Sequence, residues 1–187
     1  IRSAPRSNLP RITAAAVVHP VINPAVNYVV NAIVFQPDGK FVIGGNFIQL
    51  QPGGAVATTR NHLARLNATG TPDVSLDPNV GGRVSAIAAQ ADGKVLIGGV
   101  FGSVAGVVRN NLARVNADGS LDTAFNPNIS GAVNVITVQP DGKILVGGTF
   151  SYAGVVARNN LVRLNADGTV DMSFDPNPNG TISAIIV

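Results

Sequence analysis

The sequence has no cysteine, no tryptophan and no glutamate, so that all ten of its acidic residues are aspartates. Without cysteine there is neither a disulfide framework nor a thiolate nucleophile. Aromatic residues make up 5% of the chain and charged residues 12%, whereas hydrophobic residues make up 45%. Such a composition is unlike that of a disordered chain, and it predicts a folded domain with few bulky side chains.

Long apolar runs and clusters of charge are also missing. The most apolar stretch near the N-terminus, residues 14–18, is far shorter than the roughly 20 residues of a membrane-spanning helix. No signal peptide is visible, and no membrane span is expected. The net charge of +3 comes from Arg2, Arg6 and Arg11, since ten basic and ten acidic residues follow from Pro24 onward. Evenly spaced charges of this kind argue against a nucleic-acid partner.

One segment of twelve residues, 139–150, organises the chain. It has two earlier copies, at residues 36–47 and 90–101. Asp92 and Asp141, which occupy the same place in successive copies, lie 49 positions apart, whereas Asp38 and Asp92 lie 54 apart. The five extra residues fall in one loop of the first unit. A period of this length is typical of repeat architectures.

Each unit is punctuated by turn residues about every ten positions, which predicts four short strands. In the third unit we expect these strands at 133–139, 143–150, 160–165 and 169–174. The Pro-Asp-Gly step at 140–142 suits a tight hairpin, because proline fixes φ and glycine accepts positive φ. No segment has helical periodicity. The predicted fold is therefore all-β.

Four antiparallel strands in about fifty residues match one blade of a β-propeller, whereas a solenoid rung would be shorter. We predict a β-propeller segment of four-stranded antiparallel blades, with three complete units and a partial unit at each end. The expected divisions are the second half of a degenerate unit at 1–24, a blade with a five-residue loop insertion at 25–79, blades at 80–128 and 129–177, and the first strand of a further blade at 178–187. The whole is expected to be one domain of a longer chain.

Two motifs return in the same order and register in every unit. The first contains Asp-Gly-Lys-Ile-Leu-Val-Gly-Gly-Thr-Phe, and the second contains Arg-Asn-Asn-Leu followed by Arg-Leu-Asn-Ala-Asp-Gly-Thr. The sequence resembles the delta-60 repeat, a family of β-propeller repeats in large bacterial secreted and cell-surface proteins. The likeness covers residues 26–187 closely and 6–24 weakly. It implies a propeller in an extracellular or cell-surface protein, but no activity.

The recurrent aspartates have a structural interpretation as turn residues, because a single active site would break the repeat. The alternating oxygens of Asn116, Asp118, Ser120 and Asp122 resemble the start of a calcium loop. Gly119 comes too early for an EF-hand, and no glutamate is available as a bidentate ligand. Calcium is therefore a possible but disfavoured ligand, and no cofactor is expected.

Three arginines of the third strand are each followed eight residues later by an aspartate. The pairs are Arg65 with Asp73, Arg114 with Asp122, and Arg163 with Asp171. The intervening turn would bring the two strands side by side, which predicts a structural ion pair repeated from blade to blade. A ring of anion-binding arginines is the alternative, and it is disfavoured because each arginine has its own aspartate.

Catalytic residues are scarce. His19 and His62 are the only histidines, and no serine lies in a nucleophile elbow. We therefore expect no enzyme. The leading hypothesis is a structural and protein-interaction module of a bacterial extracellular or cell-surface protein. The alternatives are a glycan-binding adhesion propeller, which the shortage of exposed aromatic residues disfavours, and a subunit-like scaffold within a larger assembly.

Partner contacts are expected at residues that differ between units, because binding residues concentrate in the loops that a rigid scaffold positions. The loop at 48–59 has the extra residues. The candidate contacts are Gln49, Gln51, Pro52, His62, Arg83 and Tyr152. Both ends are also expected to be covered, either by other protein chains or by the rest of the same polypeptide, because strand edges there lack partners.

Overall fold

The computed structural model describes residues 25–51 and 56–187, and within these ranges every regular element is a β-strand. The strands are β1 (Val30–Phe35), β2 (Phe41–Gly45), β3 (Gln49–Leu50), β4 (Thr58–Thr59), β5 (Leu63–Leu66), β6 (Val80–Ala89), β7 (Val95–Val104), β8 (Val107–Val108), β9 (Leu112–Val115), β10 (Ala132–Val138), β11 (Ile144–Thr149), β12 (Tyr152–Ala153), β13 (Val156–Ala157) and β14 (Leu161–Leu164).

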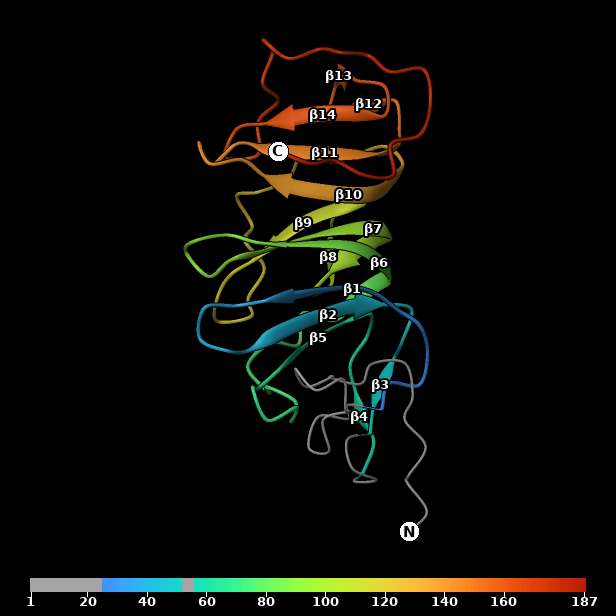
Figure 1. The fold of residues 1–187 in the computed structure, drawn as a ribbon. Helices are drawn as coiled ribbons and strands as arrows, with labels where there is room; N and C mark the ends of the chain where they lie inside the picture. The colour runs from blue at the N-terminus through green and yellow to red at the C-terminus, as the bar shows by residue number, and fades with distance from the viewer. Residues whose placement is uncertain (1–24, 52–55) are drawn as a thin grey trace.

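Three antiparallel sheets follow one another along the chain and are stacked in that order (Figure 1). The first is β1-β2-β5, the second joins β6, β7 and β9, and the third is β10-β11-β14. Within each blade the first two strands meet at an Asp-Gly turn. In the first blade the backbone amide of Gln36 donates to the Lys40 carbonyl at 2.8 Å, and Gly39 has a φ of 82°. Glycine adopts this conformation without steric cost.

The opposite end of each second strand carries a small hairpin. The variable loop expected there forms a two-stranded ladder in every blade, namely β3–β4, the end of β7 with β8, and β12–β13. The blades therefore have two distinct rims. The turn edge comprises the turns at 36–40, 90–94 and 139–143. The hairpin edge comprises these three hairpins with the residues preceding β1 and β10 and the first four residues of β6.

The expectation of an all-β chain built from four-strand antiparallel units is confirmed, but the fourth strand is very short. In each blade it pairs with the third strand through one isolated bridge, at Leu66–Pro72, Val115–Leu121 and Leu164–Val170. The reason lies in the aspartate that follows. The Asp73 carboxylate accepts hydrogen bonds from the Ser75 amide and hydroxyl, at 2.9 and 2.7 Å, and this local turn ends the ladder.

The structure assigns no strand to residues 182–187, where the sequence predicts the first strand of a further blade. They run beside the third blade without a ladder partner in the described ranges. The backbone amide of Ile182 donates to the Gly148 carbonyl at 3.1 Å, and the side-chain amide of Asn134 donates to the Ile182 carbonyl at 3.4 Å. Asn31 makes the equivalent bond to Val84 in β6. The partial unit expected at 1–24 lies outside the described residues.

Adjacent blades pack directly against each other through the Gly-Gly pair of the second strand. A Cβ on Gly44 would overlap the Val84 and Ile87 side chains of the next blade, and Gly98 meets Val133 in the same way. The second glycine of each pair lies against its own first strand, where the register shifts at a bulge. Each apolar side chain seated in this way contributes about 1.5–3 kcal/mol. The repeated glycines thus set the distance between blades.

Candidate functional site

A buried ionic cluster is built at the same place in each blade. In the first blade the Asp73 carboxylate accepts from Lys40 Nζ and from Arg65 Nε, both at 2.8 Å. Asp171 is held identically by Lys143 and Arg163. In the middle blade the distances from Asp122 are 3.2 Å to Lys94 and 2.9 Å to Arg114. The predicted arginine–aspartate pairs are therefore confirmed. Sequence reasoning missed the lysine, although it follows every Asp-Gly turn.

The clusters keep their carboxylates ionised. Burial acts to raise the pKa of Asp73, but hydrogen bonds from Lys40, Ser75 and Arg65 outweigh it, and the pKa lies well below its ordinary value. A hydrogen bond from Lys143 contributes most to the low pKa of Asp171. A general acid or base needs a pKa near the working pH. These aspartates are therefore scaffold groups rather than proton carriers.

The arginine of each cluster also reaches the following blade. Arg65 Nη1 donates to the Ala117 carbonyl at 2.8 Å, and Arg114 Nη1 donates to the Ala166 carbonyl at 2.6 Å. The Arg114 guanidinium also lies 4.3 Å from the centroid of the Phe125 ring. One side chain thus joins two strands of its own blade to the turn of its neighbour. The sequence does not show this contact, because it depends on how blades are stacked.

The oxygens of the calcium-like segment serve the turn. Asp118 accepts from the Ser120 amide and hydroxyl, at 2.9 and 2.7 Å, and Asn116 donates to the Ser120 hydroxyl. Asp122 belongs to the ionic cluster. In the residues that the structure describes, no group of three or more histidine, cysteine, aspartate or glutamate residues could hold a metal ion. The segment is built as a turn, and its oxygens bond within it.

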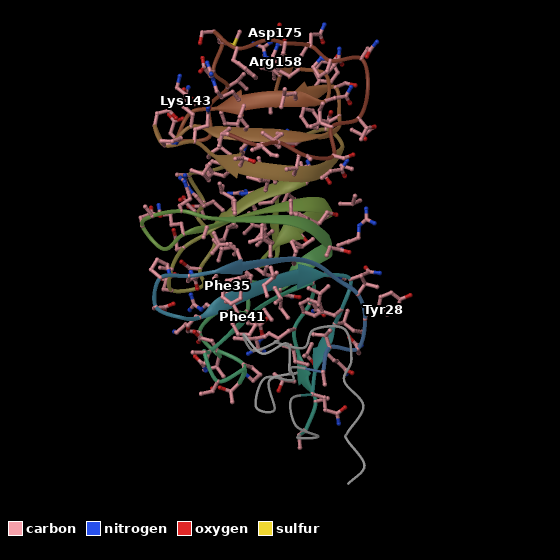
Figure 2. All side chains as sticks on the ribbon, in the orientation of Figure 1. Tyr28, Phe35, Phe41, Lys143, Arg158 and Asp175 are labelled. Carbon is pink, nitrogen blue, oxygen red and sulfur yellow. The ribbon has the colours of Figure 1, made fainter. Side chains whose placement is uncertain are left out.

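A second set of buried arginines lies at the base of the hairpins. Arg60 Nη1 contacts Asp77 Oδ2 at 3.1 Å, and Arg158 Nη1 contacts Asp175 Oδ2 at 3.2 Å. Figure 2 shows the latter pair together at the last blade. Each arginine also donates to the carbonyl of the residue before it, but in the middle blade asparagine replaces the aspartate, and Arg109 donates to the Thr123 carbonyl instead of to a carboxylate. The sequence shows that Asp77 and Asp175 share a position that asparagine fills in the middle unit, but it did not predict that this position pairs with the arginine.

Three of the predicted contact residues lie exposed at the hairpin edge. Gln49, in β3, and Tyr152, in β12, occupy the same position in the first and third blades. Arg83, in β6, lies at that edge of the middle blade. Gln51 is exposed just after β3, whereas Pro52 lies outside the described residues. The candidates are therefore spread over successive blades along one rim and do not form a single pocket.

His62 differs from the other candidates because it is partly buried. Its φ is 64°, its amide donates to the Phe47 carbonyl at 2.8 Å, and its Nδ1 has no hydrogen-bond partner in the described part of the chain. Burial lowers the pKa of His62, and a hydrogen bond involving the Gly45 backbone partly opposes this. Asn111, at the same place in the next blade, bonds through both ends of its amide. His62 thus stands where the other blades have asparagine, without matching the two side-chain hydrogen bonds that Asn111 makes.

Tyr28 is a hairpin-edge residue that sequence reasoning did not select. It is about half exposed and follows Asn27, whose backbone amide donates to the backbone carbonyl of Gln49 at 3.2 Å. Asn27 Oδ1 accepts in turn from the Gln49 amide at 3.0 Å. Figure 2 places Tyr28 at the rim opposite Lys143. The signal was available, since the equivalent residues Gly82 and Gly131 lack side chains.

Stacked antiparallel blades joined by repeated contacts define a β-propeller repeat protein. The chain belongs to the family described as a domain of unknown function (DUF5122) beta-propeller, whose model matches residues 36–76, 90–125 and 139–174. These matches correspond to the three repeated units and cover more than half of the chain. The family assignment supports the fold and the repeat, and it agrees with the resemblance seen in the sequence without naming that repeat family.

The chain is similar to a protein described as "Crystal structure of WD40 beta propeller domain of Doa1", with 16% sequence identity and a TM-score of 0.41. The likeness covers 79% of this chain and 54% of that one, so the chain spans about half of that domain's length. No curated protein matches the sequence. Within the described residues, no helix is suited to crossing a membrane.

Proposed function

We propose that this domain is a structural and protein-interaction module of a bacterial extracellular or cell-surface protein, and that it binds partners through its hairpin edge. The observation that supports this proposal is where the blades differ. The turn edge has Asp-Gly-Lys in all three units, whereas equivalent hairpin-edge positions have Gln49, Ser103 and Tyr152. A rigid frame with variable rim residues is the usual arrangement of a binding scaffold.

The exposed side chains at that edge suit protein recognition. Tyrosine and arginine are enriched at energetically important interface positions, since they combine a large contact area with a polar group. Tyr28, Arg83 and Tyr152 lie along this rim, one in each successive blade. Partners that span several blades would meet a different side chain at each of them.

A second candidate is binding of glycans for adhesion. It is favoured by the half-exposed rings of Tyr28 and Tyr152 at the same edge. Aromatic faces of this kind can stack on sugars.

A partner for the open face of the third blade is also proposed. There the Arg163 side chain is 22% exposed, against 6% and 10% for Arg65 and Arg114, which donate to a following blade.

Photo-crosslinking in the protein's native cells tests the leading proposal. A benzophenone amino acid at Tyr152 should give adducts with protein, and the same group at Asp38, on the turn edge, is the matched control. Equal adducts from both positions would contradict the proposal. A glycan array probed with the purified domain separates the candidates, since specific glycan binding that is lost in the variant Tyr28→Ser/Tyr152→Ser would favour adhesion.

A further inference from the structure

The middle blade has a buried arginine without an acidic partner. In the blades on either side, Arg60 and Arg158 are each covered by an aspartate, Asp77 or Asp175, at 3.1 and 3.2 Å. Asn126 occupies the same position in the middle blade. Among the described residues, five arginines are buried, and Arg109 is the one that does not pair with an aspartate.

Arg109 is buried as deeply as its counterparts, with 5% of the residue exposed against 7% for Arg60 and 6% for Arg158. Its Nη1 donates to the Val108 carbonyl, as Arg60 and Arg158 donate to the carbonyls of their preceding residues, and its Nη2 donates to the Thr123 carbonyl, both at 2.8 Å. The Nε of all three arginines has no partner in the described residues, so what sets Arg109 apart is the missing carboxylate. Carbonyl groups accept these bonds but carry no net charge. Burying a charge without a counter-charge costs free energy. A partner's carboxylate would therefore bind more favourably beside Arg109 than beside Arg60 or Arg158, which are already paired.

Asn126 leaves room for such a carboxylate. Its side chain is exposed, and its amide makes no hydrogen bond within the ranges that the structure covers. It can therefore swing aside at little cost, unlike an aspartate held by the arginine. The residue is isosteric with aspartate and occupies the pairing position, but it cannot neutralise the guanidinium.

A mainly apolar cavity of about 330 Å³ begins beside Asn126 and extends to the third blade. Two of its rim residues are unusually exposed for their type, Val155 at 98% and Met172 at 67%. Pro127 and Val156 also line it. Covering these side chains would remove apolar surface from water, so the cavity favours an apolar group of a partner.

Asp167 is the one charged residue that lines this cavity, and it restricts where an acidic group can bind. Its Oδ1 accepts from the Thr169 amide at 2.9 Å and from the Thr169 hydroxyl at 2.7 Å. It lies in a turn of the third blade, whereas Asn126 belongs to the middle blade. A carboxylate near Asp167 would be repelled, so the favourable position is the one over Arg109.

We propose that the junction of the middle and third blades binds an acidic protein segment in which an aspartate or glutamate neighbours an apolar residue. The carboxylate pairs with Arg109, as Asp77 and Asp175 pair with Arg60 and Arg158, and the apolar side chain enters the cavity. This partner chemistry rests on the proposed interaction function. It uses residues other than the hairpin-edge tyrosines.

Two peptides test the proposal on the purified chain, acetyl-Ala-Glu-Leu-Ala-amide and the same peptide with Gln in place of Glu. By NMR titration, the glutamate peptide should bind at least fivefold more tightly and shift the Arg109 Nε–H signal. In Asn126→Asp the chain supplies its own carboxylate, and the preference should vanish. That variant should fold, because the same pair exists in the neighbouring blades. Asp77→Asn is the reciprocal control, in which acetate should newly shift the Arg60 signal.

Equal binding of the two peptides would overturn the proposal, as would an Asn126→Asp variant that keeps the full preference. Acetate binding as tightly as the glutamate peptide would also overturn it, because the apolar cavity would then contribute nothing. The outcome is separable from that of the proposed function. Peptide binding without crosslinks from Tyr152 would retain this site and reject recognition through the hairpin-edge tyrosines, and the converse would do the opposite.

Discussion

The two rims belong to the same blades, but they differ in how far their side chains repeat from one blade to the next. At the turn edge each blade repeats the same Asp-Gly-Lys turn, and its lysine belongs to a buried ionic cluster. At the hairpin edge one position holds Gln49, Ser103 or Tyr152, of which Gln49 and Tyr152 are exposed. The comparison teaches that side chains repeated between blades build the frame. Those that differ are available for recognition.

The largest expected effect comes from filling the space between blades. In Gly98→Val the new side chain would collide with Val133 and Ile136 of the next blade. Overpacking against a neighbouring sheet should lower the free energy of unfolding by about 3 kcal/mol or more. Thermal denaturation measures the loss. Gly102→Ala is the control, because nothing lies within 4 Å of the added Cβ, and an equal loss there would refute the assignment of Gly98.

Breaking one ionic cluster should have the next largest effect. Asp122→Ala leaves Arg114 and Lys94 without their shared carboxylate, and the expected destabilisation is about 2–3 kcal/mol. Asp175→Ala removes a half-exposed carboxylate but leaves Arg158 buried, so it should cost about 1 kcal/mol, less than Asp122→Ala. Chemical denaturation of both variants checks the difference. Equal losses would show that burial does not decide the value of these pairs.

The third prediction concerns pH and His62, which replaces the asparagine of the other two blades. Burial lowers the pKa of His62 below its ordinary value of 6.5, so the unfolded chain takes up the proton more readily than the folded chain. Stability should therefore fall as the pH drops below about 6.5. His62→Asn, which restores the residue of the other blades, should remove this component and stabilise the fold by about 1 kcal/mol. An unchanged pH profile in that variant would contradict the prediction.

The smallest effect on stability is expected at the hairpin edge. Tyr152→Ser removes an exposed ring and should change the free energy of unfolding by less than about 0.5 kcal/mol. The same substitution should abolish partner or glycan binding at that edge, as measured by crosslinking or on the array. A melting temperature lowered by more than a few degrees would instead make Tyr152 part of the frame.

Much of the frame could be predicted from the sequence, because it depends on local rules that recur. Pro-Asp-Gly and Asn-Ala-Asp-Gly steps determine turns, and an arginine eight residues before an aspartate reaches it across one turn. The short fourth strand was harder to see. The Asp73 and Ser75 side chains end that ladder by bonding locally, in competition with strand pairing.

Contacts between blades could not be read from the chain alone. The bond from Arg65 to the Ala117 carbonyl joins residues 52 positions apart, and its register depends on how two sheets stack. The uncompensated Arg109 lies within one blade, and it was hidden because Arg109 and Asn126 are 17 positions apart, beyond any single turn. The repeat does contain the signal, because Arg60–Asp77 and Arg158–Asp175 have the same separation.

A saturation scan of folding stability, read by protease resistance at every described position, tests the division between frame and recognition most directly. The account predicts that damaging substitutions concentrate at positions shared by the three blades, such as Gly98 and Asp122. Gln49, Arg83 and Tyr152 should tolerate nearly every residue. Substitutions at these three positions that destabilise the chain as much as those at Asp122 would contradict the account.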